Sequence, residues 1–425
     1  MKWKDWDLNL KVRLFGEGAN NLLFWMFFPF MAIYFSNSFG KETAGLLLVA
    51  TQFISVILGL IGGYCADHFG RKRMMVLSTA AQGVTFVFFA LANSPWLSSP
   101  VLTFISFTVL GLCGNFYWPA SHSMVADVVD EKHRNEVFAV FYTSINITVV
   151  LGPIIGGFLF FSGRFWLLLA CILTSFSLAF VLQKFVRETA PIRKKEEVTE
   201  DQNWVHYLLH QLSDYRVITK DRLFLLFILA GILVSQTFMQ LDLLIAVYTN
   251  DQIHLQTILK LGDWSLQASG HKVFSWLVSE NGFLVAIFTV FMTKWMTKYR
   301  ERTVFMTSCI FYGISMLVMG WTHNIWGLFL AIAIFTAAEI MVVGIQEGFV
   351  SKLAPEEVRG QYFAASSLRF TIGRMIAPMA IPLTVWVGFT WTFVILGVLA
   401  FVGASLYGLM FRLYEGRRRT QTLTA

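Results

Sequence analysis

Two carboxyl groups inside apolar runs are the residues of this sequence best placed to do chemistry. Asp242 stands in the run MQLDLL, and Glu339 stands in AAEIMVV. A charge at the centre of a bilayer costs about 2.5–3.5 kcal/mol on insertion scales, so such residues usually face a cavity and serve function. Desolvation raises the pKa of a carboxyl whereas a nearby cation lowers it, and a conformational change can switch either effect. We therefore predict that Asp242 and Glu339 bind and release protons.

A second set of polar and aromatic side chains lies in other apolar runs. Apolar pockets with a few polar groups suit amphiphilic ligands, and aromatic faces suit cations. On this basis we predict substrate contacts from Glu17, Asn20, Asn21, Phe24 and Trp118, and Arg374 would be the anchor for an anionic substrate.

Each of these residues also has a structural interpretation. An ion pair with Arg374 is the alternative for Glu339, and a position near the outer end of its helix is the alternative for Asp242. An i,i+4 pair with Arg13 explains Glu17 equally well. With 42 phenylalanines in the chain, any one aromatic residue is more easily explained by packing than by ligand contact.

The elements that must position these residues are membrane helices. Of the 425 residues, 56% are hydrophobic and only 14% are charged, whereas soluble proteins carry about 25% charged residues. A helix needs about 20 apolar residues to cross the hydrocarbon core. Twelve runs meet this condition, approximately at 13–35, 43–66, 74–92, 100–126, 137–161, 164–186, 222–249, 279–299, 303–322, 325–350, 361–385 and 387–412.

The loop charges predict how these spans are oriented. The predicted outer loops contain only Lys41, Arg164, Lys260 and Lys272 as cations, and the other loop cations fall on the opposite side. By the positive-inside rule, both termini are cytoplasmic. The net charge of +7 is then an orientation signal in a bacterial plasma membrane and predicts no nucleic-acid partner. The four cysteines all fall within predicted spans, so no disulfide or metal site is expected.

The chain divides into two halves around a charged segment. We predict a six-helix bundle over 1–186, a cytoplasmic linker with an amphipathic helix over 187–221, and a second six-helix bundle over 222–425. Residues 130–139 and 355–364 are similar to each other at an offset of 225, which indicates two parallel repeats. A longer outer loop at 250–278 receives no role.

A loop motif joins the second and third predicted spans. Gly62 to Arg73 reads GGYCADHFGRKR, in which small residues precede Asp67 and a turn at Gly70 precedes Arg71. This pattern closely resembles the signature loop of major facilitator transporters. The resemblance implies that Asp67, Gly70, Arg71 and the further acid Asp127 act in the conformational switch. It also implies that Asp67 faces the start of the eleventh span.

A second motif lies in the fifth span. Gly152, Pro153 and Gly156 belong to LGPIIGG, which resembles the motif of drug/proton antiporters in the same superfamily. Glycines allow close helix packing and proline removes a helix hydrogen bond, so the motif suits a moving seam. With MQLD, AAE and a cation early in the eleventh span, the chain resembles the LmrP-type multidrug antiporters. The resemblance implies a substrate contact from Asn146, which matches a polar position in span five. The chain departs from these antiporters by having Phe141 in place of an acid in span five, and by lacking an arginine in span four.

Together these features predict an all-α integral membrane protein with the major facilitator fold, working by alternating access. The predicted function is proton-coupled export of amphiphilic, cationic drugs by a monomer that uses the proton gradient and no bound cofactor. A transporter of a metabolite, sugar, peptide or lipid, anionic if Arg369 and Arg374 face the cavity, is the alternative. An enzyme is not expected, since no Ser/His/Asp set, metal cluster or phosphate loop is apparent.

Overall fold

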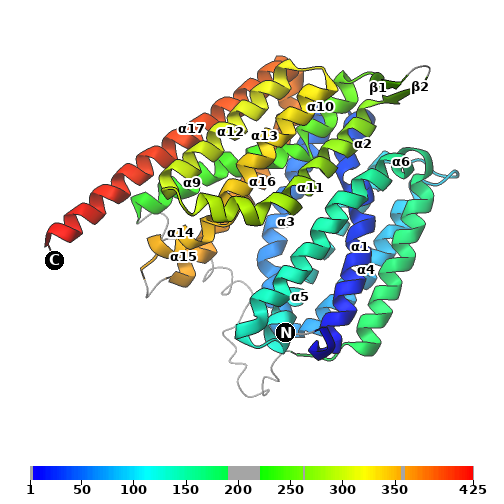
Figure 1. Cartoon of the computed structure of the whole chain (residues 1–425). Coiled ribbons are helices and arrows are strands. Elements are labelled where there is room, and N and C mark those ends of the chain that lie inside the picture. Colours follow the sequence, from blue (N-terminus) through cyan, green and yellow to red (C-terminus); the bar gives the residue numbers. More distant parts are fainter. Residues whose placement is uncertain (1–2, 190–220, 262–263, 356–358, 425) are drawn as a thin grey trace. The chain divides into compact units, whose positions relative to one another are not determined.

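The computed structural model describes residues 3–189, 221–261, 264–355 and 359–424, and these residues form two compact units (Figure 1). One unit takes in the described residues of Met1–Phe39 and Ala50–Leu209. The other takes in those of Gly40–Val49 and His210–Ala425. The amphipathic helix predicted within the linker lies outside the described residues.

The first unit is built from long apolar helices. In chain order these are α1 (Leu8–Phe27), η2 (Phe28–Phe30), α2 (Met31–Phe39), α3 (Lys41–Phe69), α4 (Arg71–Leu91), α5 (Pro100–Val128) and α6 (Glu131–Phe185), and α3 begins in the second unit. The sequence explains several boundaries. Asp7 caps α1 by accepting a hydrogen bond from the Asn9 backbone N–H, and Ser99 caps α5 in the same way through Leu102. Gly70, which precedes α4, has a φ of 95° that other residues rarely adopt.

The second unit repeats this plan with more interruptions. Its elements are α9 (Arg222–Phe238), η4 (Met239–Leu241), α10 (Leu244–Gln252), β1 (Gln256–Leu261), β2 (Trp264–Ala268), α11 (Gly270–Met296), α12 (Glu301–Trp321), α13 (Ile325–Val343), α14 (Gln346–Leu353), α15 (Arg359–Ser366), α16 (Leu368–Ile376), η6 (Ala377–Met379) and α17 (Ala380–Thr424).

Ten segments of the described chain are long and apolar enough to cross a membrane. Two of them, Glu136–Phe185 and Gln361–Arg417, have 50 and 57 residues and so are long enough for two spans each. Their backbone leaves the helical region at Gly163 and at Gly388, close to the predicted boundaries between spans five and six and between spans eleven and twelve. The twelve predicted spans are therefore all present, and the predicted fold class is confirmed.

The outer loop predicted at 250–278 is shorter than the sequence indicated. An antiparallel hairpin of β1 and β2 occupies its centre, and α11 already begins at Gly270. The predicted start of this span near 279 was wrong because the mixed polarity of residues 250–278 indicated a loop. That start would place Ser279, Glu280 and Asn281 at the end of the helix. They lie about two and a half turns inside the helix instead.

Close packing within each unit depends on small residues and large apolar ones. In the first unit α1 packs along α6, and α4 packs against both α5 and α6 (Figure 1). In the second unit α12 packs against α13 and α17, over a core that includes Phe227, Phe305 and Phe349. A Cβ atom at Gly373 would lie 2.6 Å from the Cβ of Ser235, so this glycine lets α16 approach α9 closely.

Candidate functional site

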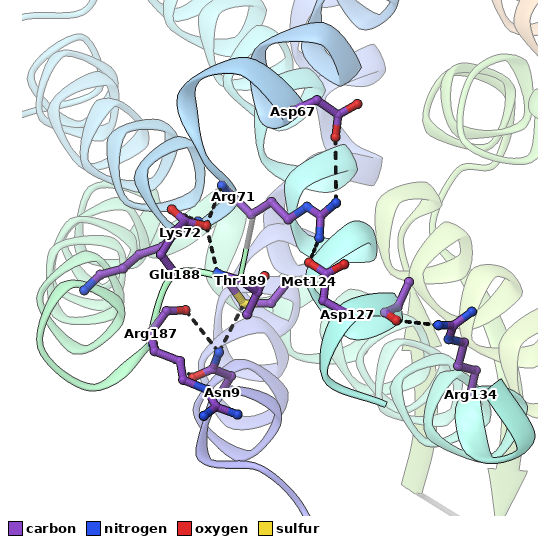
Figure 2. Close-up of polar contacts among 11 residues, drawn as sticks. Asn9, Asp67, Arg71, Lys72, Met124, Asp127, Arg134, Arg187, Glu188 and Thr189 are labelled. Carbon is purple, nitrogen blue, oxygen red and sulfur yellow. Dashed lines mark hydrogen bonds and ion pairs between the residues drawn. The ribbon is translucent and has the colours of Figure 1, made fainter. Parts of the chain in front are cut away.

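The loop motif forms a charge cluster at one end of the first unit (Figure 2). Arg71, the first residue of α4, forms an ion pair with Asp127 near the end of α5. A guanidinium nitrogen of Arg71 also lies 3.8 Å from the carboxylate of Asp67 at the end of α3. Four predicted switch residues, Asp67, Gly70, Arg71 and Asp127, therefore lie together. The predicted contact between Asp67 and span eleven stays a prediction.

Sequence reasoning missed a third acid of this cluster, Glu188, which follows the sixth span. Its carboxylate accepts hydrogen bonds from the backbone N–H groups of Arg71 at 2.9 Å and of Lys72 at 3.2 and 3.1 Å (Figure 2). These are unpaired donors at the N-terminus of α4, where a negative charge is stabilised. The neighbouring Arg187 exchanges backbone hydrogen bonds with the Asn9 side chain. The chain leaving the sixth span is thus held to α4 and to α1.

The glycines of the fifth-span motif lie against α1. A Cβ atom at Gly152 would meet Trp25, and one at Gly156 would clash with the backbone of Met26. The backbone stays helical through Pro153, and α6 departs from helical geometry at Gly163 instead. The motif therefore gives a tight α1–α6 contact, and its role in the conformational switch stays a prediction.

Glu17 is part of a buried polar cluster between α1 and α5. One carboxylate oxygen accepts hydrogen bonds from Arg13 Nε, from the Tyr117 hydroxyl and from the Ser121 hydroxyl, each at 2.8 Å. Only 6% of Glu17 is exposed, and Arg13 also donates to Ser121. The donors are side chains of α1 and α5 themselves, so the Glu17 carboxylate links these two helices. A substrate contact by Glu17 stays a prediction.

The other predicted substrate residues of this unit have different surroundings, and their contact with substrate stays a prediction. The Phe24 ring stacks on Phe28 at 4.6 Å, and the Asn146 amide donates to the Tyr142 carbonyl one turn away. Trp118 lies next to Tyr117 and is 37% exposed. A groove of about 580 Å³ does run between α1 and α6, but Asn20, Asn21 and these residues do not line it. Its lining is largely apolar: Leu14, Phe15, Gly18, Ala19, Leu22, Ala139, Val140, Thr143, Ser144, Ile147, Thr148 and Leu151.

In the second unit the two predicted proton carriers lie close together. Asp242 follows η4 at the interruption between α9 and α10, and Glu339 lies within α13. The two are near enough for their charges to interact. Glu339 accepts a hydrogen bond from Asn281 Nδ2 at 2.9 Å, and the same nitrogen lies 3.0 Å from the Thr336 hydroxyl. One carboxylate oxygen of Asp242 is buried without a hydrogen-bond partner among the described residues.

Sequence reasoning missed Glu280 and Asn281 of α11. Asn281 holds Glu339, and one oxygen of Glu280 is buried without a described partner. Counting α11 from Gly270 would have placed both residues deep in the span.

The two arginines of α16 have different environments. The guanidinium of Arg369 lies 4.4 Å from the centre of the Phe227 ring, its Nε donates to the Ser366 carbonyl, and only 1% of the residue is exposed. Arg369 is therefore part of the packed interior of the unit. Arg374 is exposed, and no hydrogen bond or ion pair to Glu339 is found among the described residues.

Comparison with known proteins identifies the family. The sequence profile of the Major Facilitator Superfamily matches residues 14–270 and 264–424. The chain belongs to this superfamily. A relative from Planococcus maritimus described as "Na(+), Li(+), K(+)/H(+) antiporter" is 54% identical over 98% of this chain and 99% of its own length.

More distant similarities also extend over most of the chain. "Multidrug resistance protein MdtH" of Salmonella choleraesuis is 24% identical over 84% of this chain and 81% of its own. A crystal structure of a POT family transporter with 5-aminolevulinic acid superimposes with a TM-score of 0.75 at 16% identity, covering 94% of this chain and 95% of the other.

Membership in the superfamily settles the general class of activity. This major facilitator protein is a multi-pass membrane transporter and not an enzyme. Its closely similar antiporter relative supports antiport as the kind of transport. The narrower likeness to LmrP-type antiporters stays a prediction.

Proposed function

We propose that this transporter exchanges monovalent alkali cations for protons across the bacterial plasma membrane. The observation that carries the proposal is the 54% identity, over nearly the whole of both chains, to a relative described as a Na⁺, Li⁺, K⁺/H⁺ antiporter. Two carboxyl groups of the second unit, Asp242 and Glu339, support the proposal because they lie within its membrane spans.

The exchange follows from competition for a buried carboxylate. In a membrane interior, a carboxylate is neutralised by a proton or by a metal cation, and an uncompensated charge is costly. A site that faces the two sides in turn would load a cation on one side and a proton on the other. Asn281, which donates to Glu339, would keep that carboxyl oriented in both states.

The charge cluster of the first unit would act as a conformational latch. Arg71 contacts Asp127 and Asp67, and Glu188 fixes the start of α4, so three helix ends and the linker meet there. With both termini cytoplasmic, this latch would close the cytoplasmic side. Its rupture and formation would accompany alternating access.

Proton movement in proteoliposomes tests the proposal. Vesicles containing the purified transporter and a pH-sensitive dye receive a pulse of NaCl, KCl or LiCl, with choline chloride as the matched control. We expect alkali cations, and not choline, to drive proton movement, and we expect Glu339→Gln to abolish it. Wild-type protein that moves no protons in response to any alkali cation would refute the proposed function.

Export of amphiphilic cations is a second candidate function. The apolar groove of about 580 Å³ between α1 and α6 has the size and lining of a site for such molecules, and relatives described as multidrug resistance proteins are 24% identical. Ethidium export driven by a pH gradient, competed by NaCl, would support one carrier for both kinds of cation. An anionic substrate is less well supported, because Arg369 is committed to the interior of its unit.

A further inference from the structure

Two interrupted helices of the second unit meet at one point. The α9–α10 segment is broken by η4 (Met239–Leu241), and the α16–α17 segment is broken by η6 (Ala377–Met379), where Pro378 lacks a backbone N–H. The two breaks are in contact, and Gln240 Nε2 donates to the Ala377 carbonyl at 3.1 Å. Interrupted membrane helices release backbone carbonyls from the helical pattern, and in transporters such breaks commonly hold the coupling ion.

The first break contains two buried acceptors without donors. Gln240 is completely buried. Its Nε2 donates hydrogen bonds to the backbone carbonyls of Gln236 at 2.9 Å and of Ala377 at 3.1 Å. These two bonds fix the orientation of the amide, so its oxygen Oε1 faces away from both carbonyls. Oε1 of Gln240 and Oδ1 of Asp242 have no hydrogen-bond partner among the described residues. Gln240 lies within the short 3₁₀ helix η4, and Asp242 is the residue that directly follows it.

Unpaired buried acceptors cost free energy, and the cost is greater for a charged group. A ligand that relieves this cost must bring positive charge, because both atoms are oxygen acceptors. Carboxylate and carbonyl oxygens prefer hard cations. The single Asp242 carboxylate at the break matches the charge of one monovalent ion.

We propose that the transported alkali cation binds at the η4 break, with Gln240 Oε1 and the Asp242 carboxylate as ligands. This inference rests on the proposed alkali cation/proton exchange and assigns its cation site. Gln240 then has two roles: its amide nitrogen joins the two broken helices, and its oxygen binds the ion.

A pair of substitutions at Gln240 separates the two roles. Gln240→Glu keeps an oxygen ligand but gives up the amide donors to Gln236 and Ala377. The methionine side chain in Gln240→Met has a similar length but supplies neither the oxygen ligand nor the amide donors. If the oxygen binds the cation, Glu preserves cation binding and Met removes it. If Gln240 only joins the helices, both variants are impaired alike. Gln236→Met is the matched control, because Gln236 is also buried but its amide donates to Leu233 and Thr237 of its own helix.

The experiment measures cation binding to the purified full-length transporter in detergent. The melting temperature is followed during titration with NaCl, with choline chloride keeping the ionic strength constant, since a ligand that binds only the folded state raises it. We expect NaCl to raise the melting temperature of the wild type, of Gln240→Glu and of Gln236→Met. Gln240→Met and Asp242→Asn should need at least about tenfold more NaCl, a loss of about 1.4 kcal/mol in binding.

Either of two results overturns the site. One is a wild-type response to NaCl in both Gln240→Met and Asp242→Asn, and the other is equal loss in Gln240→Glu and Gln240→Met. If Gln240→Met does not fold, the other two variants test the site. Asp242→Asn must then lose the rise in melting temperature with NaCl, and Gln240→Glu must keep it. Sodium-driven proton movement in vesicles is measured alongside. If it persists with unchanged sodium dependence in these variants, the site is wrong and the proposed exchange stands; if the wild type lacks it, the exchange itself fails.

Discussion

The buried Glu17 carboxylate of the first unit differs in its hydrogen bonding from the η4 break of the second unit. The Glu17 oxygen between α1 and α5 has three donors from its own chain, whereas Gln240 and Asp242 at the η4 break each keep an oxygen without a described donor. Arg13 Nη1 of the Glu17 cluster is also buried without a described partner, but it is a donor beside a carboxylate. An unpaired buried acceptor is costly unless a ligand supplies a positive group. The contrast indicates that Glu17 supports the structure and that Asp242 takes part in the transport reaction.

Loss of the Asp242 charge should have the largest effect on transport. We expect Asp242→Asn to reduce alkali cation-driven proton movement to the level of empty vesicles. Its melting temperature should stay the same or rise, since an unpaired buried charge has been removed. Thermal unfolding in detergent, measured on the same preparation, checks the second part. A strongly destabilised Asp242→Asn protein would give Asp242 the structural role assigned here to Glu17.

Loss of the Glu17 charge should instead affect the stability of the first unit. Glu17→Gln leaves Arg13 as a buried charge without its carboxylate, and breaking a buried pair in this way costs about 3–5 kcal/mol. We expect a large fall in melting temperature. The double variant Arg13→Met/Glu17→Met should recover part of this loss. No recovery in the double variant would show that the two residues are not coupled.

Removal of a single donor to Glu17 should have a smaller effect. Tyr117→Phe deletes the hydroxyl that donates to Glu17 at 2.8 Å, and hydrogen bonds to charged groups contribute about 1.5–3 kcal/mol. A melting-temperature decrease smaller than that of Glu17→Gln is expected. The exposed Tyr142 provides the matched control. Equal effects of Tyr117→Phe and Tyr142→Phe would contradict the account of this cluster.

The smallest of these effects is expected at the start of α4. Glu188→Gln replaces the carboxylate that accepts from the Arg71 and Lys72 backbone with a neutral amide, and capping interactions contribute about 0.5–2 kcal/mol. Faster amide hydrogen exchange over the first turn of α4 would report the loss. Glu415→Gln, at an exposed ion pair in α17, should leave that turn unchanged. Unchanged exchange in Glu188→Gln would remove Glu188 from the latch.

The fold could be predicted from the sequence because each membrane span requires its own continuous run of apolar residues. Runs of about 20 apolar residues marked the spans, and the turns at Gly163 and Gly388 lie where those runs were divided. Asp67, Arg71 and Asp127 lie together in the folded unit, and their role in the conformational switch stays a prediction.

Parts of the candidate sites depend on pairings that sequence spacing does not reveal. Gln240 is bonded to Ala377, 137 residues away, so the lack of a donor for its oxygen emerges only in the folded unit. Glu188 follows a span like many loop acids, and its bonds to Arg71 and Lys72 cross more than 100 residues. Glu280 was missed because the β1–β2 hairpin ends the outer loop early and α11 begins at Gly270, nine residues before the predicted start of the span at 279.

The most direct test of the central claim compares wild type with Asp242→Asn for sodium-driven proton movement in proteoliposomes. A sodium gradient is imposed without a pH gradient. In wild-type vesicles protons should move in the direction opposite to the sodium flow and change the internal pH, and in Asp242→Asn vesicles the pH should not change. A pH change of wild-type size in Asp242→Asn vesicles would contradict the claim that the second unit carries the exchanged ions through this carboxylate.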